Sequence, residues 1–112
     1  GNNGSMCTLH ADSTRSVFPK LAAYMSMSLT SLPIETTNLL IASSVHFVVH
    51  IEVVRGQRRV SSIREVVDSD GLTIMSNEVV RNVNGVVGLG YPLREETREL
   101  FEEFGFREEM LR

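Results

Sequence analysis

The sequence contains one cysteine, no tryptophan and three prolines among its 112 residues. One thiol cannot form an internal disulfide, so a reducing compartment such as the cytosol is expected. No apolar run approaches the roughly 20 residues of a membrane-spanning helix. Basic residues do not outnumber acidic ones, and the formal charge of −3 gives no electrostatic basis for binding nucleic acid. The length suits one domain.

The sequence also lacks the short motifs that identify complete catalytic sites. It contains no G-x-x-x-x-G-K-[ST] phosphate loop, no G-x-S-x-G nucleophile turn and no C-x-x-C pair. The chain alone therefore does not carry a complete catalytic constellation of these kinds.

The clearest pattern is the alternation in "VHFVVHIEVV", residues 45–54, where every odd position is apolar. A period of two predicts a strand whose odd-numbered face is buried. His46 and His50 then lie on the less buried face. Four strand residues span about 13 Å, whereas zinc ligands lie about 2 Å from the metal, so the two histidines cannot share one ion and no metal site is expected.

A hairpin follows this strand. Gly56-Gln57 fits a two-residue turn with glycine first, which sets Val53 opposite Val60. The tip carries three arginines: Arg55, Arg58 and Arg59. Such a cluster is either simply solvated or meets a phosphate or an acidic neighbour, because guanidinium groups pair well with both.

Residues 6–9 predict the end of a short buried strand, with Cys7 as a buried side chain. Asp12 or Ser13 can cap the turn that follows. A main helix is then expected with Pro19 at its first position, where the missing N–H is tolerated.

Helical spacing places four residues of this helix toward the core: Leu21, Met25, Leu29 and Leu32. A second helix is expected over residues 34–43, with Ile34, Ile41 and Val45 toward the core. Both stripes are typical of core packing rather than of a ligand site.

Beyond the hairpin, short strands are expected over residues 72–75 and 78–83, with a tight turn at residues 84–85. A charged amphipathic helix over residues 93–104 ends near Gly105, the residue type that favours a helix C-terminus. The predicted fold class is α/β, in the order β-α-α-β-β followed by small β elements and a terminal helix.

The predicted strand over residues 6–9 delivers Thr8 and His10 to its carboxyl end. Ligands of open α/β sheets bind at that end of the strands. Spacing alone leaves two interpretations of His10: a local hydrogen-bonding residue, or a group that faces a phosphate.

The segment "GSMCTLHADS" resembles the histidine box of type II and type IV secretion-system ATPases, and is most similar to the tight-adherence pilus-assembly branch. The hairpin region resembles the family's downstream part and ends in an R-R-V-x-x-I-x-E-V pattern at residues 58–66. "NGVVGLGYPLREETRELFEEFGF" is similar to the family's C-terminal tail. The resemblance covers nearly the whole chain.

The resemblance implies a C-terminal portion of a RecA-like P-loop ATPase, with residues 1–67 in the ATPase domain and residues 68–112 as a β/α tail. The intact protein would be a homo-hexamer that hydrolyses ATP with Mg²⁺. It would be cytoplasmic, peripheral at the membrane, and would bind inner-membrane secretion or pilus platform proteins. This portion supplies the histidine box without the phosphate loop and is expected to be inactive alone.

By motif match the catalytic residue is His10, and the residues near the nucleotide are Gly4, Ser5 and Thr8. Arg58 and Arg59 are candidate subunit-interface arginines. The alternative is a non-enzymatic α/β module that uses the hairpin of residues 45–67 as an oligomer or partner edge.

Overall fold

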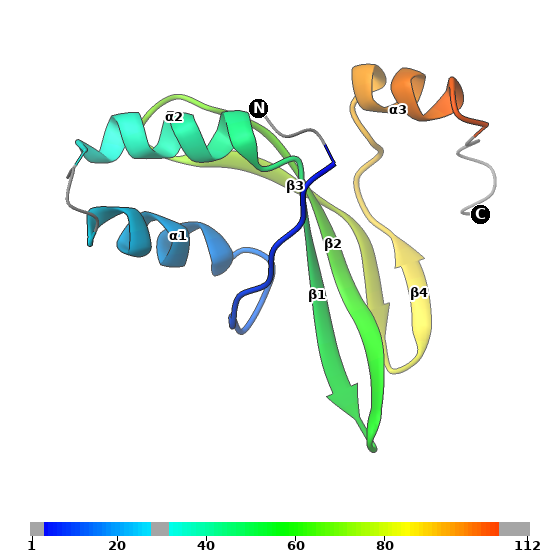
Figure 1. The fold of residues 1–112 in the computed structure, drawn as a ribbon. Coiled ribbons are helices and arrows are strands. Elements are labelled where there is room, and N and C mark those ends of the chain that lie inside the picture. The colour runs from blue at the N-terminus through cyan, green and yellow to red at the C-terminus, as the bar shows by residue number, and fades with distance from the viewer. Residues whose placement is uncertain (1–3, 28–31, 106–112) are drawn as a thin grey trace.

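The computed structural model describes residues 4–27 and 32–105 (Figure 1). Two helices precede four strands and a third helix follows them. In chain order the elements are α1 (Val17–Ser26), α2 (Ile34–Ser44), β1 (Phe47–Val54), β2 (Gln57–Ser69), β3 (Ile74–Val83), β4 (Val86–Leu89) and α3 (Glu95–Glu102).

The four strands form one sheet in the order β1-β2-β3-β4, and every neighbouring pair is antiparallel. The chain is therefore α/β with an antiparallel meander, and its helices and strands are segregated along the sequence. α1 and α2 lie side by side at one end of the long strands, and α3 lies beyond β4 (Figure 1). The expected boundary at residue 67 falls inside β2.

The expected strand over residues 6–9 is wrong. This segment is irregular, Met6 is 97% exposed, and Cys7 is exposed rather than buried. A strand requires a hydrogen-bonded neighbour, and no strand of the described residues pairs with this segment. In the part of the chain that the structure describes, residues 6–9 therefore have no strand to pair with.

The core lies between α1, α2 and the sheet. Its buried members are Phe18, Ile41 and Val66, one from each of these elements. The half-buried side chains around them are Leu21, Ala22, Met25, Ala42, Val45, Val48 and Ile74. Ile34, which was expected to face the core, is 54% exposed, and Leu29 lies outside the described residues.

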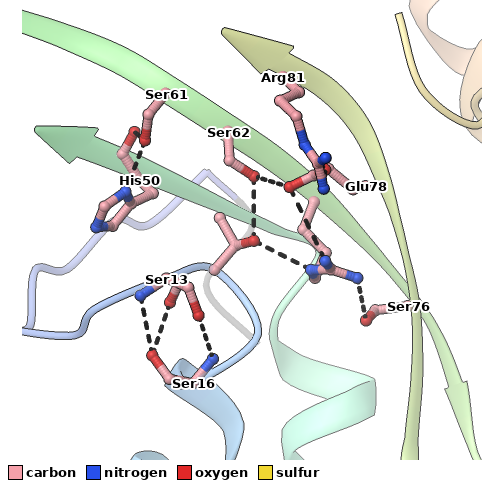
Figure 2. Close-up of polar contacts among 10 residues, drawn as sticks. Ser13, Ser16, His50, Ser61, Ser62, Ser76, Glu78 and Arg81 are labelled. Carbon is pink, nitrogen blue, oxygen red and sulfur yellow. Dashed lines mark hydrogen bonds and ion pairs between the residues drawn. The ribbon is translucent and has the colours of Figure 1, made fainter. Parts of the chain in front are cut away.

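α1 begins at Val17, two residues earlier than predicted. Pro19 is thus its third residue, which the first turn tolerates because the N–H groups there have no intrahelical partner. The turn before the helix is closed by two serines: Ser13 N–H donates to Ser16 Oγ at 3.0 Å and Ser16 N–H to Ser13 Oγ at 3.1 Å (Figure 2).

β1 forms where the alternation predicts a strand, but the exposed face is the opposite one. Val49, Ile51 and Val53 are 51, 59 and 64% exposed, whereas the even-numbered residues of β1 are half-buried. The even face is covered because Val48 packs on the core and His50 contacts the segment before α1. The period of two predicts a strand, yet it does not determine which face the helices cover.

The hairpin turn is Arg55-Gly56 rather than Gly56-Gln57. Both turn residues have positive φ, 53° and 78°, as in a type I′ turn. Val53 therefore lies opposite Arg58, and Ile51 opposite Val60. The predicted register, with Val53 opposite Val60, is wrong.

The second tight turn is confirmed at Asn84-Gly85, with φ of 53° and 84°. β3 is one strand of 10 residues where two short strands were expected. The terminal helix is also confirmed, although it is shorter than predicted, and Gly105 follows it with φ of 89°.

Candidate functional site

A polar cleft of about 420 Å³ separates the segment before α1 from the face of β1, β2 and β3. The loop side contributes Asp12, Ser13, Thr14 and Arg15. The sheet side contributes His50, Glu52, Ser61, Ser62, Arg64, Glu78 and Arg81. Figure 2 shows the hydrogen bonds that join these two sides.

Thr14 links the loop to the sheet. Its side chain is almost fully buried, at 2% exposure, and Arg64 Nε donates to Thr14 Oγ1 at 3.1 Å. Thr14 Oγ1 also lies 3.1 Å from Ser62 Oγ. Ser62 uses its own proton on Glu78 Oε2 at 2.6 Å, so Thr14 is the donor to Ser62. The chain of donors therefore runs from Arg64 through Thr14 and Ser62 to Glu78.

Glu78 is the negative centre of this network. Arg81 Nε donates to Glu78 Oε1 at 2.6 Å, and Arg64 Nη2 lies 4.0 Å from Glu78 Oε2. Burial alone would raise the pKa of Glu78, but the Ser62 hydroxyl and the Arg81 and Arg64 guanidiniums outweigh it, and the pKa lies below its usual value. Glu78 is therefore held as an ionised carboxylate, and its negative charge stabilises the neighbouring guanidinium groups.

Arg64 is a buried cation, 7% exposed. Besides Thr14 it donates from Nη1 to Ser76 Oγ at 3.2 Å. Burial, and then the nearby positive charge of Arg15, lower the pKa of Arg64 below its ordinary value, while Glu78 acts in the opposite direction. Its hydrogen bonds offset the cost of burying the charge.

His50 connects the sheet to the residue next to His10. Its Nδ1 lies 2.6 Å from Ser61 Oγ, and its Nε2 lies 3.3 Å from the carbonyl oxygen of Ala11. The His10 carbonyl oxygen in turn accepts a hydrogen bond from Lys20 Nζ of α1. Two consecutive backbone carbonyls of this segment are thus held by side chains from β1 and α1.

The residues matched to the histidine box lie on the irregular segment before this cleft. Gly4, Ser5, Thr8 and His10 are all exposed, and Gly4 has a positive φ of 86°. Among the described residues, no hydrogen bond or ion pair of the His10 imidazole is found, in contrast to its well-held carbonyl. The histidine side chain faces solvent on an anchored backbone.

The hairpin arginines separate into two kinds. Arg59 Nε donates to Glu52 Oε1 at 3.2 Å across the β1–β2 pair. Arg58 and Arg55 are exposed at the tip. The acidic neighbour expected for this cluster is therefore found within the chain for Arg59.

His46 lies exposed just before β1, whereas His50 lies on the half-buried face of β1, so the prediction that both histidines lie on the less buried face is wrong for His50. Among residues 4–27 and 32–105, no cluster of three histidine, cysteine or acidic side chains could hold a metal ion. None of the helices found in these ranges combines the length and apolar character needed to cross a membrane.

The sequence patterns did not point to the buried polar residues Thr14, Ser62, Arg64 and Glu65, nor to the half-buried Glu78. Glu65 is 1% exposed and accepts a hydrogen bond from the N–H of Arg94 at 2.9 Å, which ties the residue before α3 to β2. A signal was available: the two charged residues inside "VSSIREVV" interrupt an apolar strand, and buried charges require partners.

Comparison of the chain with known protein families and with curated proteins gave no match.

Proposed function

We propose that the chain is the C-terminal portion of a hexameric ATPase that powers pilus assembly or type II/IV secretion. The proposal rests on the segment "GSMCTLHADS", which resembles the histidine box of these ATPases. The observation that supports it is the state of His10: an exposed imidazole on a backbone whose carbonyls at His10 and Ala11 are both held. A fixed backbone limits the positions that the exposed side chain can reach, and such positioning is what a group acting on a bound nucleotide requires.

Phosphoryl transfer depends mainly on positioning and on stabilising charge. In the proposed role, the His10 imidazole donates a hydrogen bond toward the terminal phosphate or orients the catalytic glutamate of the ATPase domain. Gly4, Ser5 and Thr8 supply backbone and hydroxyl groups on the same segment. ATP and Mg²⁺ belong to the intact protein, in which a phosphate loop binds them.

In the intact protein we propose that the chain up to the end of β2 belongs to the RecA-like domain and that the part after β2 is its tail, because the expected boundary at residue 67 falls inside that strand. The assembly is a homo-hexamer at the cytoplasmic face of the membrane, bound to platform proteins. Arg58, exposed at the hairpin tip, is the better candidate for a contact with a neighbouring subunit, because Arg59 already pairs with Glu52.

The reading frame upstream of Gly1 provides the first test. A phosphate-loop motif, G-x-x-x-x-G-K-[ST], is expected within roughly 150 residues, about the length of one domain. A reading frame without it contradicts the proposal.

The second test is His10→Ala in the longer protein. Turnover is expected to fall about 100-fold or more, as on the loss of a group that stabilises the transition state, while ATP affinity changes little. His46→Ala, an exposed histidine outside the box, serves as the control and leaves turnover unchanged. A collapse of ATP affinity with normal turnover per bound nucleotide would contradict the role of His10.

The 112-residue chain by itself is expected to bind ATP negligibly, because it lacks the lysine-bearing phosphate loop. Isothermal titration calorimetry measures this directly. Micromolar affinity for ATP would show that the chain contains its own nucleotide site and would contradict the assignment.

A second candidate function is a non-enzymatic module that associates through the β1–β2 hairpin. The specific observation in its favour is that β1 is an edge strand whose odd-numbered face, Val49, Ile51 and Val53, is exposed. Exposed apolar edge strands are prone to pair with other chains. This candidate predicts that the 112-residue chain is a stable monomer or dimer that does not depend on any upstream sequence, with the hairpin as its edge toward another copy or a partner.

A further inference from the structure

Three arginines and one glutamate line the junction of two adjoining clefts. The polar cleft of about 420 Å³ and a second cleft of about 700 Å³ share Arg15, Arg64, Glu78 and Arg81. No other charged side chain of the described residues lines the second cleft. Three positive charges therefore face a single negative charge there.

Glu78 pairs closely with only one of the three arginines. Its Oε1 accepts from Arg81 Nε and its Oε2 accepts from Ser62 Oγ, each at 2.6 Å. Arg64 Nη2 lies 4.0 Å from Oε2, which is too long for a hydrogen bond. The charge of Glu78 thus leaves two cations of the junction without a close counter-charge.

Arg64 keeps donors without an acceptor. The residue is 7% exposed, and it donates from Nε to Thr14 Oγ1 and from Nη1 to Ser76 Oγ. For Nη2, the part of the chain that the structure describes offers no acceptor within hydrogen-bond distance. Because an unpaired donor on a buried cation is costly, an acceptor that enters through the clefts would stabilise Arg64.

Arg15 is the second cation without a counter-charge. Its side chain is exposed on the loop before α1, and within residues 4–27 and 32–105 it makes no hydrogen bond or ion pair. Burial, and then the positive charge of Arg15, lower the pKa of Arg64, so the two guanidiniums lie close enough to repel each other. A bound anion would attract both of them.

We propose that Arg15, Arg64 and Arg81 form a binding site for a phosphate group, carried by inorganic phosphate or by a small phosphate monoester. Near neutral pH such a group carries a charge of about −1.5 to −2, which matches two unpaired cations better than a carboxylate does. Arginine also binds phosphate oxygens through two parallel N–H groups. Ser76 and Asn77 line the second cleft with further hydrogen-bonding groups.

The second cleft also has room for the organic part of a monoester. Its volume lies in the range of small-molecule sites. Tyr91 and Leu89 line it beside the arginines, so an organic group on the phosphate has apolar surface to contact. The inference does not rest on the proposed ATPase function, since His10 lines neither cleft.

Titration of the ¹⁵N-labelled 112-residue chain with inorganic phosphate, at about pH 7.5 and constant ionic strength, tests the site. The Nε–H signal of Arg64 and the amide signals of Ser76 and Asn77 are expected to shift saturably, with a Kd of about 1 mM for so small a ligand. Chloride at the same ionic strength is expected to leave them in place. This affinity is far weaker than the micromolar ATP binding that would contradict the proposed function.

Arg15→Gln removes an unpaired cation without breaking a hydrogen bond of the described chain. It is expected to weaken phosphate binding about tenfold or more, the effect of one charge-assisted contact. Arg58→Gln is the matched control, because it removes the same charge about 20 Å along β2 from Arg64, beyond the Debye length. Its Kd is expected to stay within about twofold of the wild type. The amide signals of Phe18, Ile41 and Val66 show that both variants are folded.

Phenyl phosphate and benzoate identify the chemistry of the ligand. Phenyl phosphate that binds more tightly than inorganic phosphate indicates a monoester, whereas equal affinities indicate free phosphate. Benzoate, which has the same ring and a single charge, is expected to bind about tenfold more weakly than phenyl phosphate.

Three results would overturn the phosphate site: no saturable shift at Arg64, Ser76 and Asn77, equal weakening by Arg15→Gln and Arg58→Gln, or benzoate binding as tight as that of phenyl phosphate. None of them bears on the role proposed for His10, which the turnover of His10→Ala judges separately.

Discussion

Glu78 accepts hydrogen bonds from Ser62 and Arg81 while a third partner, Arg64, lies 4.0 Å away. At the scale of single residues, the cleft is held by this carboxylate rather than by apolar contacts. In such a network, removal of one member costs more than its own hydrogen bonds, because Ser62 and Arg64 remain buried without it. The free energy of unfolding is therefore expected to be sensitive to the charge of Glu78.

Glu78→Gln keeps the shape of the side chain and removes its charge. We expect the free energy of unfolding at pH 7 to fall by about 1–3 kcal/mol, because Arg64 and Arg81 lose their counter-charge. Urea denaturation monitored by circular dichroism measures the change. Glu99→Gln, at an exposed position of α3, is the matched control and is expected to lie within about 0.5 kcal/mol of the wild type.

The pH dependence of this difference follows from the direction of the pKa shift. The pKa of Glu78 in the folded state lies below its usual value, because the Ser62 hydroxyl and the Arg81 and Arg64 guanidiniums outweigh the effect of burial. Its contribution is therefore fully present above the unfolded pKa and is lost as the pH falls through the lower, folded pKa. The wild type and Glu78→Gln are expected to converge in stability at acidic pH, and a difference that stays constant would contradict the linkage.

Single residues of the candidate site were only partly predictable from the sequence. His10 was proposed from the order of residues around it, which a sequence records directly, and its role stays a prediction. The cross-strand partners of Glu78 were not predicted, because Ser62 and Arg64 lie on β2 and only the sheet register brings them to β3. Thr14 then joins these two residues from the loop before α1, a long-range contact that no local pattern records.

Among the elements, the two hairpins offer an internal comparison. Both have a two-residue turn with positive φ at both residues, Arg55-Gly56 in one and Asn84-Gly85 in the other. Asparagine tolerates the left-handed region better than arginine does. The first hairpin therefore carries a conformational cost that the second avoids.

Arg55→Asn is expected to raise the free energy of unfolding by about 0.5–1 kcal/mol, because it removes that cost. The reverse change, Asn84→Arg, is expected to lower it by a similar amount. Thermal unfolding of both variants measures the two changes in stability. If Arg55→Asn and Asn84→Arg shift the melting temperature in the same direction, the turn conformation is not the cause.

The "GLGY" stretch at the end of β4 contains a glycine that packing requires. The N–H of Gly90 donates to the Val79 carbonyl at 2.9 Å, and a Cβ added at Gly90 would lie 2.2 Å from the carbonyl oxygen of Glu78. At Gly88, in contrast, an added Cβ would lie 3.8 Å from the carbonyl oxygen of Arg81. The two glycines at the end of β4 therefore differ in the space available for an added Cβ.

Gly90→Ala is expected to lower the free energy of unfolding by about 1–3 kcal/mol, because backbone atoms must move apart. Gly88→Ala is the control and is expected to change it by less than about 0.5 kcal/mol. Chemical denaturation of both variants distinguishes them. Equal stabilities would mean that the close approach at Glu78 relaxes without cost.

The elements themselves were largely predictable, since periodicity and turn residues are local signals. Two helices, the hairpin strands, the turn at Asn84 and the terminal helix all form near the expected residues. The exposed face of β1 and the register of its hairpin were not predictable in the same way. The exposed face depends on which side of β1 the helices cover. The register depends on the turn, which lies one residue earlier than a two-residue turn with glycine first would place it.

At the scale of the whole molecule, two apolar features are left without partners among the described residues. Residues 6–9 form no strand, and Val49, Ile51 and Val53 of β1 are exposed at the edge of the sheet, although Phe47 on the same face stacks on Phe101. Strand formation and burial both require a neighbour, so a local pattern cannot supply them. Under the proposed function, the rest of the ATPase domain covers these features, whereas under the second candidate another copy of the chain does.

Ile51→Lys distinguishes the two cases because it places a charge at the centre of the exposed face, beside Val49 and Val53. If copies pair through β1, sedimentation velocity shows association of the wild type at tens of micromolar, and Ile51→Lys abolishes it. Leu72→Lys, at a 74%-exposed position in the loop between β2 and β3, is the control and keeps the association. A wild type that stays monomeric at about 200 µM has a dimer Kd above that concentration, which removes the self-associating form of the second candidate. It leaves the face to be covered by the longer ATPase, in which Ile51→Lys is expected to lower the melting temperature.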